Sequence, residues 1–371
     1  MDTSVRYDVV VIGAGPGGAL AARRCAENGL HTLLVEKRKL PRDKVCSGMV
    51  MGRWAQEILI ENFGPIPDEV LVPPQSLLGY AVHVSGTEIQ FLDVETPITW
   101  RKHLDNWMTN RARDAGAEVW EETRLIGASQ IEKRYSVRLA KGDGILDVEC
   151  TFLVGADGAR SALRAALFPE LKPTYWHCYR ECYNIALDLP PRRFNFFSSV
   201  QTAPFYFCTH DKDGYMLMEG GAQIGRIKQT AGESRDYLIK HHGMDASQKP
   251  VWRDGCVEPI LYGELFSGSF RPARANAMLV GDAAGLNMPV TGEGVGTSMK
   301  TGAEAANAII QSVKGNQPVD AVYMKTIEDI IGRFKDTYQF SRRIKAAAAG
   351  GDPKALSDAL LESWDHALRL F

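Results

Sequence analysis

The stretch VVVIGAGPGGALAA, which begins at Val9, constrains the fold of this chain more than any other feature of the sequence. A short apolar run ends at Ile12 and leads into Gly13-Ala14-Gly15-Pro16-Gly17-Gly18, which has the spacing Gly-x-Gly-x-x-Gly. A continuous apolar run of this length is typical of a strand buried in a parallel sheet. The alanine-rich segment after the glycines favours a closely packed helix, and HTLLVEK predicts a second strand. We therefore expect residues 1–37 to form one βαβ unit.

This glycine turn has the form of a pyrophosphate site. Between a strand and a helix, backbone N–H groups at the helix N-terminus can face a phosphate, and the second glycine gives the anion access. Glu36 follows Gly18 by 18 residues, at the end of the second predicted strand. An acid at this place accepts the hydrogen bonds of an adenosine ribose, and it would repel a 2′-phosphate. The alternative interpretation is a glycine-rich turn that binds no ligand.

Two further strings resemble motifs of one group of flavoproteins. LVGADGARSALR, Leu153–Arg164, resembles the DG motif of the group, with Asp157 and Gly158 at its turn. LVGDAAGLNMPVTGEGVGTSM, Leu279–Met299, resembles the GD motif of the same group. The group includes aromatic hydroxylases and geranylgeranyl reductases, and the chain resembles the geranylgeranyl reductase family of FAD-dependent oxidoreductases over roughly residues 5–310.

The resemblance implies that the two glycine-rich loops hold one FAD. In the family the aspartate at the position of Asp282 bonds the ribityl chain, and the loop at Pro289–Gly296 passes the flavin ring. Glycines 292, 294 and 296 would let the backbone approach a flat ring. A helix that begins near Val295 would direct its positive end at that ring. The first loop is then expected to hold the AMP end and the second the ribityl–flavin end.

The resemblance implies further contacts. Lys44-Val45-Cys46-Ser47-Gly48 stands where the family carries a Lys-x-Cys-Gly-Gly-like segment, which would place Cys46 close to the flavin. In the family an arginine at the position of Arg101 contacts FAD, and Leu125 falls where a backbone group meets the adenine. A catalytic role for Cys46 is one hypothesis, and a small loop residue without chemistry is the other.

The residues expected to bind the cofactor are Gly13, Ala14, Gly15, Pro16, Gly17, Gly18, Glu36, Lys37, Lys44, Cys46, Ser47, Gly48, Arg101, Leu125, Asp157, Gly158, Gly281, Asp282, Pro289, Gly292, Gly294, Val295 and Gly296. No metal site is expected, because Cys178 and Cys182, with His177 beside them, have no second ligand pair at metal-like spacing.

The sequence departs from the family at the segment over the flavin. Geranylgeranyl reductases carry Tyr-x-Trp-x-Phe-Pro there, and the nearest string here is Tyr215-Met216-Leu217-Met218-Glu219-Gly220, which keeps only the tyrosine. Tyr206 and Tyr215 are the candidate substrate residues. The alternative is that these aromatic side chains are ordinary core of a β-sheet.

The fold class expected is α/β, with a Rossmann-like FAD-binding domain of glutathione-reductase type, similar to hydroxylases. It would consist of residues 1–75, 100–170 and 271–316. A mostly antiparallel β-sheet substrate domain, residues 76–99 and 171–270, would be inserted into it, and residues 317–371 would form a C-terminal helical region. Met324, Ile327, Ile330, Ile331 and Phe334 form an apolar stripe at helical spacing, which favours core packing. Peripheral membrane contact is the alternative use of this stripe.

Composition excludes several classes of protein. The chain has 371 residues, 45% of them hydrophobic, and a net charge of -2, so nothing favours binding to nucleic acid or to an anionic membrane. No apolar run predicts a transmembrane segment, and the N-terminal residues do not resemble a signal peptide. Seven cysteines, an odd number, suit a reducing cytoplasm better than a disulfide framework.

The sequence is compatible with three functions. A reductase would pass a hydride from flavin N5 to a carbon–carbon double bond of an apolar or isoprenoid-like substrate, and the Lys-x-Cys-x-Gly segment favours it. An NAD(P)H-dependent flavin monooxygenase would hydroxylate an aromatic or polycyclic substrate. A flavin electron-transfer subunit would work with a protein partner. Since there is no second Gly-x-Gly-x-x-Gly unit, electrons are expected from transiently bound NAD(P)H or from a reduced redox protein such as ferredoxin.

Overall fold

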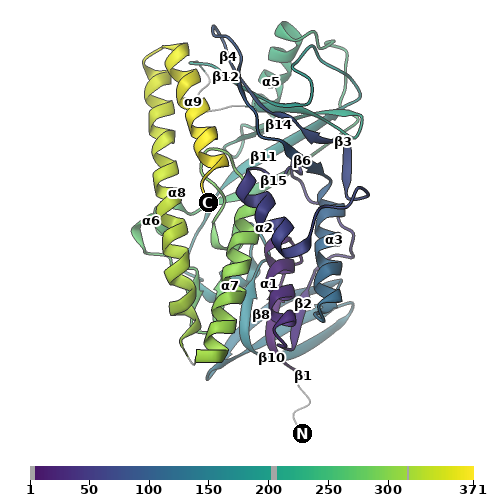
Figure 1. Cartoon of the computed structure of the whole chain (residues 1–371), viewed down its shortest axis with the longest axis vertical. Helices are drawn as coiled ribbons and strands as arrows, with labels where there is room; N and C mark the ends of the chain where they lie inside the picture. Colours follow the sequence, from purple (N-terminus) through teal and green to yellow (C-terminus); the bar gives the residue numbers. More distant parts are fainter. Residues whose placement is uncertain (1–4, 202–206, 316) are drawn as a thin grey trace.

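The computed structural model describes residues 5–201, 207–315 and 317–371, which form two large sheets, one two-stranded ribbon and a set of helices (Figure 1). Within these residues the first sheet has eight strands. They are β1 (Val5–Ile12), β2 (Thr32–Val35), β7 (Glu118–Trp120), β8 (Thr123–Ile131), β9 (Arg134–Lys141), β10 (Gly144–Gly155), β16 (Ala273–Arg274) and β17 (Ala277–Leu279).

The centre of the first sheet is parallel and unites segments that are far apart in the sequence. β17, β10, β1, β2 and β7 lie side by side in this order and run parallel. β9 pairs antiparallel with β10, β8 with β9, and β16 with β17. Val9, Val10 and Val11 are completely buried, as expected for a strand covered on both faces. The predicted βαβ unit is confirmed.

Four helices pack beside this sheet: α1 (Pro16–Glu27), α2 (Arg53–Phe63), α3 (Arg101–Asp114) and α7 (Val295–Gly315). α1 lies between α3 and α7 (Figure 1). The α1–α7 crossing depends on glycine, because a Cβ at Gly302 would overlap the carbonyl oxygen of Gly17. A Cβ at Gly17 would in turn lie 2.6 Å from the carbonyl oxygen of Ser298.

The second sheet is mostly antiparallel, as expected. Its strands, in order across the sheet, are β15 (Trp252–Ile260), β11 (Thr174–Tyr183), β14 (Tyr215–Ala222), β13 (Phe207–Lys212), β12 (Arg193–Ser198), β4 (Gly79–Val84) and β5 (Gln90–Leu92). β12 and β4 are the parallel pair among them. β3 (Leu71–Leu77) and β6 (Thr96–Thr99) form a separate antiparallel ribbon.

The C-terminal helix α8 (Val319–Ala349) runs past both sheets along one side of the molecule (Figure 1). α9 (Pro353–Leu368) turns back along α8 and packs beside β4 and β5 of the second sheet. Asp352 starts α9 by accepting hydrogen bonds from the N–H groups of Lys354 and Ala355. The stripe predicted for core packing is buried at four of its positions, and Ile331 is partly buried against the same core. Among the helices of the described residues, none is both long and apolar enough to cross a bilayer.

Several helices were not predicted. The sequence suggested no helix at α2. It predicted a mostly antiparallel sheet for residues 76–99 and 171–270, whereas α5 (Ile227–His241) also lies within this part. The buried residues of α5 are Ala231, Ser234 and Leu238. Since one of them is polar and another small, the sequence shows only a weak helical repeat of apolar residues. The short elements α4 (Ala162–Leu167), α6 (Tyr262–Ser267) and the 3-10 turn η1 (Gly281–Ala284) complete the fold.

We expect Gly302→Ala to destabilise the protein by about 1–3 kcal/mol, because the added methyl group forces α7 away from α1. Gly332→Ala is the matched control, since it also lies within a helix and a Cβ there meets nothing within 4 Å. That change should stabilise the protein by about 0.5–1 kcal/mol. Urea unfolding measures both, and equal effects of the two substitutions would contradict the account of the crossing.

Candidate active site

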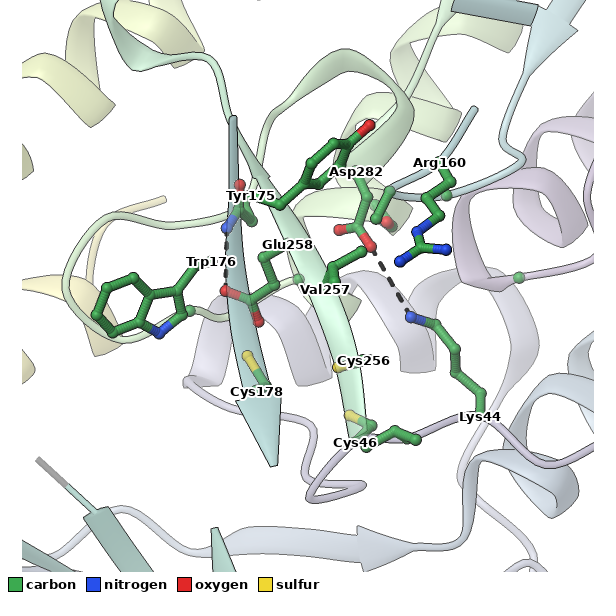
Figure 2. Close-up of a pocket in the computed structure, with 18 of the residues that line it drawn as sticks. Lys44, Cys46, Arg160, Tyr175, Trp176, Cys178, Cys256, Val257, Glu258 and Asp282 are labelled. Carbon is green, nitrogen blue, oxygen red and sulfur yellow. Dashed lines mark hydrogen bonds and ion pairs between the residues drawn. The ribbon is translucent and has the colours of Figure 1, made fainter. Parts of the chain in front are cut away.

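A cavity of about 1390 Å³ lies between the two sheets. Its first wall consists of the loops that follow β1, β2, β10 and β17, represented by Gly13, Glu36, Asp157 and Asp282. The carboxyl ends of parallel strands meet at this edge of the first sheet, where open α/β sheets bind their ligands. The opposite wall is formed by β11, β14 and β15 of the second sheet, some of whose residues Figure 2 shows.

Most residues expected to bind the cofactor come together around this cavity. Those that line it are Gly13, Gly15, Pro16, Gly17, Glu36, Lys37, Lys44, Cys46, Ser47, Arg101, Leu125, Asp157, Gly158, Asp282, Pro289, Gly292, Gly294 and Val295. Ala14, Gly18, Gly48, Gly281 and Gly296 are not among the lining residues. The four glycines of this second set lie where a Cβ would collide with neighbouring groups, so they serve close packing instead.

The first glycine loop is open where a phosphate would need space. A Cβ at Gly15 would approach nothing closer than Arg101 Nη2, at 4.0 Å, whereas one at Gly13 would collide with the backbone of Ala156. α1 begins at Pro16, and its N-cap residue Gly15 supplies no side-chain hydrogen bond to the helix N-terminus beside the cavity. This combination of an open glycine and an uncapped helix is suited to an anion.

Two arginines beside this loop, Arg42 and Arg101, share the carboxylate of Asp105. Arg42 Nε lies 3.0 Å from Glu36 Oε2, and Arg42 Nη1 lies 2.9 Å from Asp105 Oδ2. Asp105 Oδ1 also accepts a hydrogen bond from Arg101 Nε at 2.7 Å. Glu36 accepts the N–H of Ala14 at 3.2 Å, which fixes the loop. The sequence did not point to Arg42, because it lies in a polar stretch without periodicity.

The start of α7 differs from the expectation. Glu293 accepts hydrogen bonds from the N–H groups of Gly296 at 2.6 Å and Thr297 at 3.2 Å. The positive end of α7 is therefore shared with a carboxylate of the chain itself, and it is not left free for a ring. Burial raises the pKa of Glu293 to about 7, and the hydrogen bonds from the helix oppose this shift.

The second sheet holds the Cys46 loop from the opposite side. Arg180 Nη1 donates to the Cys46 carbonyl at 2.6 Å, and Nη2 of the same side chain lies 2.8 Å from Asp254. Lys212, completely buried, donates to the Ser47 carbonyl at 2.6 Å. Burial lowers the pKa of Lys212 to about 7. Cys46 Sγ accepts the N–H of Gly48 at 3.3 Å.

A carboxylic acid faces the cavity beside the GD loop. Glu258 on β15 accepts a hydrogen bond from Asn287 Nδ2 at 3.4 Å. Burial away from bulk water raises the pKa of the Glu258 carboxyl group to about 7. The negative charge of Asp282 is the second cause of this shift. Lys44 lies 4.0 Å from Asp282 on the same side of the cavity (Figure 2).

Part of the cavity wall consists of residues that the sequence did not indicate. The lining residues it did not identify include Arg42, Arg160, Tyr175, Arg180, Glu219, Asp254, Glu258 and Asn287. Most come from loops and from the second sheet, whose strands carry no motif. Tyr206 lies outside the described residues. Tyr215 begins β14 and is absent from the described residues that line the cavity, so the prediction of Tyr215 as a substrate contact has no support in the geometry.

The fold and the cavity define a flavin-type oxidoreductase, and comparison with known proteins agrees. A family model described as FAD dependent oxidoreductase matches residues 8–160. The digeranylgeranylglycerophospholipid reductase of Methanosarcina acetivorans is 28% identical over 98% of this chain and 91% of its own length. That of Methanopyrus kandleri is 25% identical over 98% of this chain and 97% of its own.

Solved structures agree on the fold. A geranylgeranyl bacteriochlorophyll reductase-like protein from Thermoplasma acidophilum has a TM-score of 0.77 at 20% identity and covers 97% of this chain and 96% of its own. A flavin-dependent brominase has a TM-score of 0.75 at 18% identity, covering 98% and 95%. The chain is an FAD-dependent oxidoreductase. Within that class it is related to the geranylgeranyl reductases, which confirms the resemblance found in the sequence.

We expect Glu258→Gln to stabilise the FAD-free protein at pH 8 by about 1–3 kcal/mol, with little effect near pH 4.5. The pKa of Glu258 is about 7 in the folded protein, against an ordinary value of 4.5. The folded protein therefore loses stability as the pH rises between these two values. The glutamine variant cannot lose a proton and avoids this loss. Urea unfolding over this range measures the difference, with the exposed Glu88→Gln as control. A constant difference at all pH values would contradict the raised pKa.

Proposed function

We propose that the cavity binds FAD in an extended form, with the AMP end at the Gly13–Gly18 loop and the flavin beside Gly292 and Gly294. The open backbone at Gly15 supports the position of the pyrophosphate. Asn287 Oδ1 is buried at the GD loop and has no partner among the described residues, which suits a ligand with an N–H or O–H donor. The FAD-binding portion would consist of residues 1–75, 100–170 and 271–316, the segments that carry the first sheet.

The cavity also has room for a substrate. Its volume, about 1390 Å³, exceeds the roughly 300–1,000 Å³ of common ligand pockets, so a dinucleotide and a second molecule can share it. The wall formed by β11, β14 and β15 would face the substrate. Residues 76–99 and 171–270, which contain that sheet, are the proposed substrate domain.

We infer that the reaction is reduction of a carbon–carbon double bond in an isoprenoid-like lipid. The observation that carries this inference is the match, over nearly the whole chain, to proteins named digeranylgeranylglycerophospholipid reductase. Bound FAD supplies the hydride, and the protein supplies orientation and exclusion of water. Arg180 and Lys212 hold the Cys46 loop in place against the second sheet.

Saturation of a double bond also needs a proton at the second carbon. Glu258 is suited to hold it, because it lines the cavity and its pKa of about 7 leaves a large protonated fraction at neutral pH. We assign Glu258 the role of proton donor. A direct role of Cys46 in the reaction stays a prediction. That NAD(P)H or a reduced redox protein donates the electrons also stays a prediction.

The test is anaerobic reoxidation of the reduced protein. We expect a lipid with geranylgeranyl chains to restore the absorbance of oxidised flavin and to gain two hydrogens per double bond, as measured by mass spectrometry. A saturated lipid is the control. If only oxygen reoxidises the flavin, and a flavin hydroperoxide accumulates on the way, the protein is a monooxygenase and the reductase assignment fails.

Gly15→Ala tests the position of the cofactor. The backbone at this position is extended, with φ near -86°, and a Cβ meets nothing but cavity, so the fold should tolerate the change within about 1 kcal/mol. We expect FAD affinity to fall at least about tenfold, because the methyl group takes the space of the pyrophosphate. Gly263→Ala, also free of contacts, should bind FAD normally. Unchanged affinity in Gly15→Ala would refute this position.

A further inference from the structure

Two cysteines stand opposite each other in the wall of the cavity. In the antiparallel pair β11–β15, Cys178 is the register partner of Cys256, and both line the cavity (Figure 2). Directly opposed residues of such a pair have Cα atoms about 4.5–5.5 Å apart. This lies within the roughly 4.4–6.8 Å that a disulfide spans. In the structure both cysteines are free thiols.

The other cysteines have different surroundings. Among the strand pairs that the structure describes, Cys178–Cys256 is the one that sets cysteine against cysteine. Cys182 is opposite Trp252 and Leu217, and Cys208 is opposite Phe196 and Glu219. Cys25 and Cys150 are buried in the core of the first sheet. The pair in the cavity is therefore not a consequence of a general enrichment of cysteine in the core.

The side chains around the pair favour thiol chemistry. The neighbouring Cys256 side chain, burial and the Glu258 side chain raise the pKa of the Cys178 thiol. The facing Cys178 thiol lowers the pKa of the Cys256 thiol, and the Lys44 charge acts in the same direction against the effect of burial. Cys256 is therefore the more readily formed thiolate and Cys178 the neutral partner. The Glu258 carboxylate beside Cys178 can accept a proton.

We propose that Cys178 and Cys256 form a redox-active pair that delivers electrons from an external dithiol to the bound flavin. This inference rests on the FAD site proposed above. As the S–S bond forms, the two S–H bonds break; two electrons and one proton pass to the oxidised flavin, and the second proton passes to the Glu258 carboxylate. The external dithiol then restores the two thiols by thiol–disulfide exchange and leaves as its own disulfide.

The first test detects the disulfide itself and does not depend on flavin. The full chain is treated with diamide, unfolded, and alkylated with N-ethylmaleimide. We expect two fewer alkyl groups than the seven cysteines of the chain would carry, and a cross-linked peptide that contains Cys178 and Cys256. Cys178→Ala and Cys256→Ala should remove this cross-link. Cys208→Ala, another cavity position, should keep it. If wild-type protein keeps all its alkylation sites, the proposal is overturned.

The second test follows electron transfer in the FAD-loaded protein. Anaerobic dithiothreitol should bleach the flavin of wild-type protein and of Cys208→Ala at the same rate. Bleaching should be at least about tenfold slower in Cys178→Ala and in Cys256→Ala. Equal rates in all four proteins, each with bound FAD, would refute the thiol route and leave the FAD site intact. A wild-type protein that binds no FAD would refute the proposed function instead, and the alkylation pattern alone would then decide whether the pair forms.

Discussion

The structure depends on the close approach of backbones at the glycine turn after β1. Gly13 lies so near the end of β10 that a Cβ would collide with Ala156, and Gly17 lies against the backbone of α7. These contacts bring the ends of β1 and β10 and the start of α7 to one place. The two glycine-rich loops, distant in the sequence, therefore border the same cavity. Any side chain at these glycines would force the loops apart and open the cofactor site.

Paired charges organise the rest of the cavity. On the first wall Arg42 joins Glu36 to Asp105, and on the second wall Arg180 joins Asp254 to the Cys46 carbonyl. Each cation thereby fixes one loop relative to a neighbouring element, because a buried charge is stable only with partners. Glu258 has no ionic partner of this kind: it accepts one hydrogen bond from Asn287 at 3.4 Å, its pKa is raised, and it lines the cavity. The two arginines therefore position loops, whereas Glu258 is available for proton transfer.

The parts of the fold that follow from local chemistry could be predicted from the sequence. The apolar run before Gly13 and the glycine spacing predicted the βαβ unit. The family resemblance of the GD string predicted that the two glycine-rich loops share one ligand. The wall formed by β11 and β15 could not be predicted, because Arg180, Cys256 and Glu258 meet only through strand pairing between distant segments. The cap of α7 by Glu293 could not be predicted either, because it depends on how the loop before the helix turns the Glu293 carboxylate back to the N–H groups of Gly296 and Thr297.

The central claim is that one FAD spans the two glycine-rich loops. A crystal structure of the protein with FAD tests it most directly. We expect electron density for the pyrophosphate at Gly15 and the N-terminus of α1, and for the isoalloxazine ring beside Gly292 and Gly294. Asn287 Oδ1 should lie within hydrogen-bond distance of a ring donor. A flavin bound outside this cavity, or reversed within it, would contradict the account.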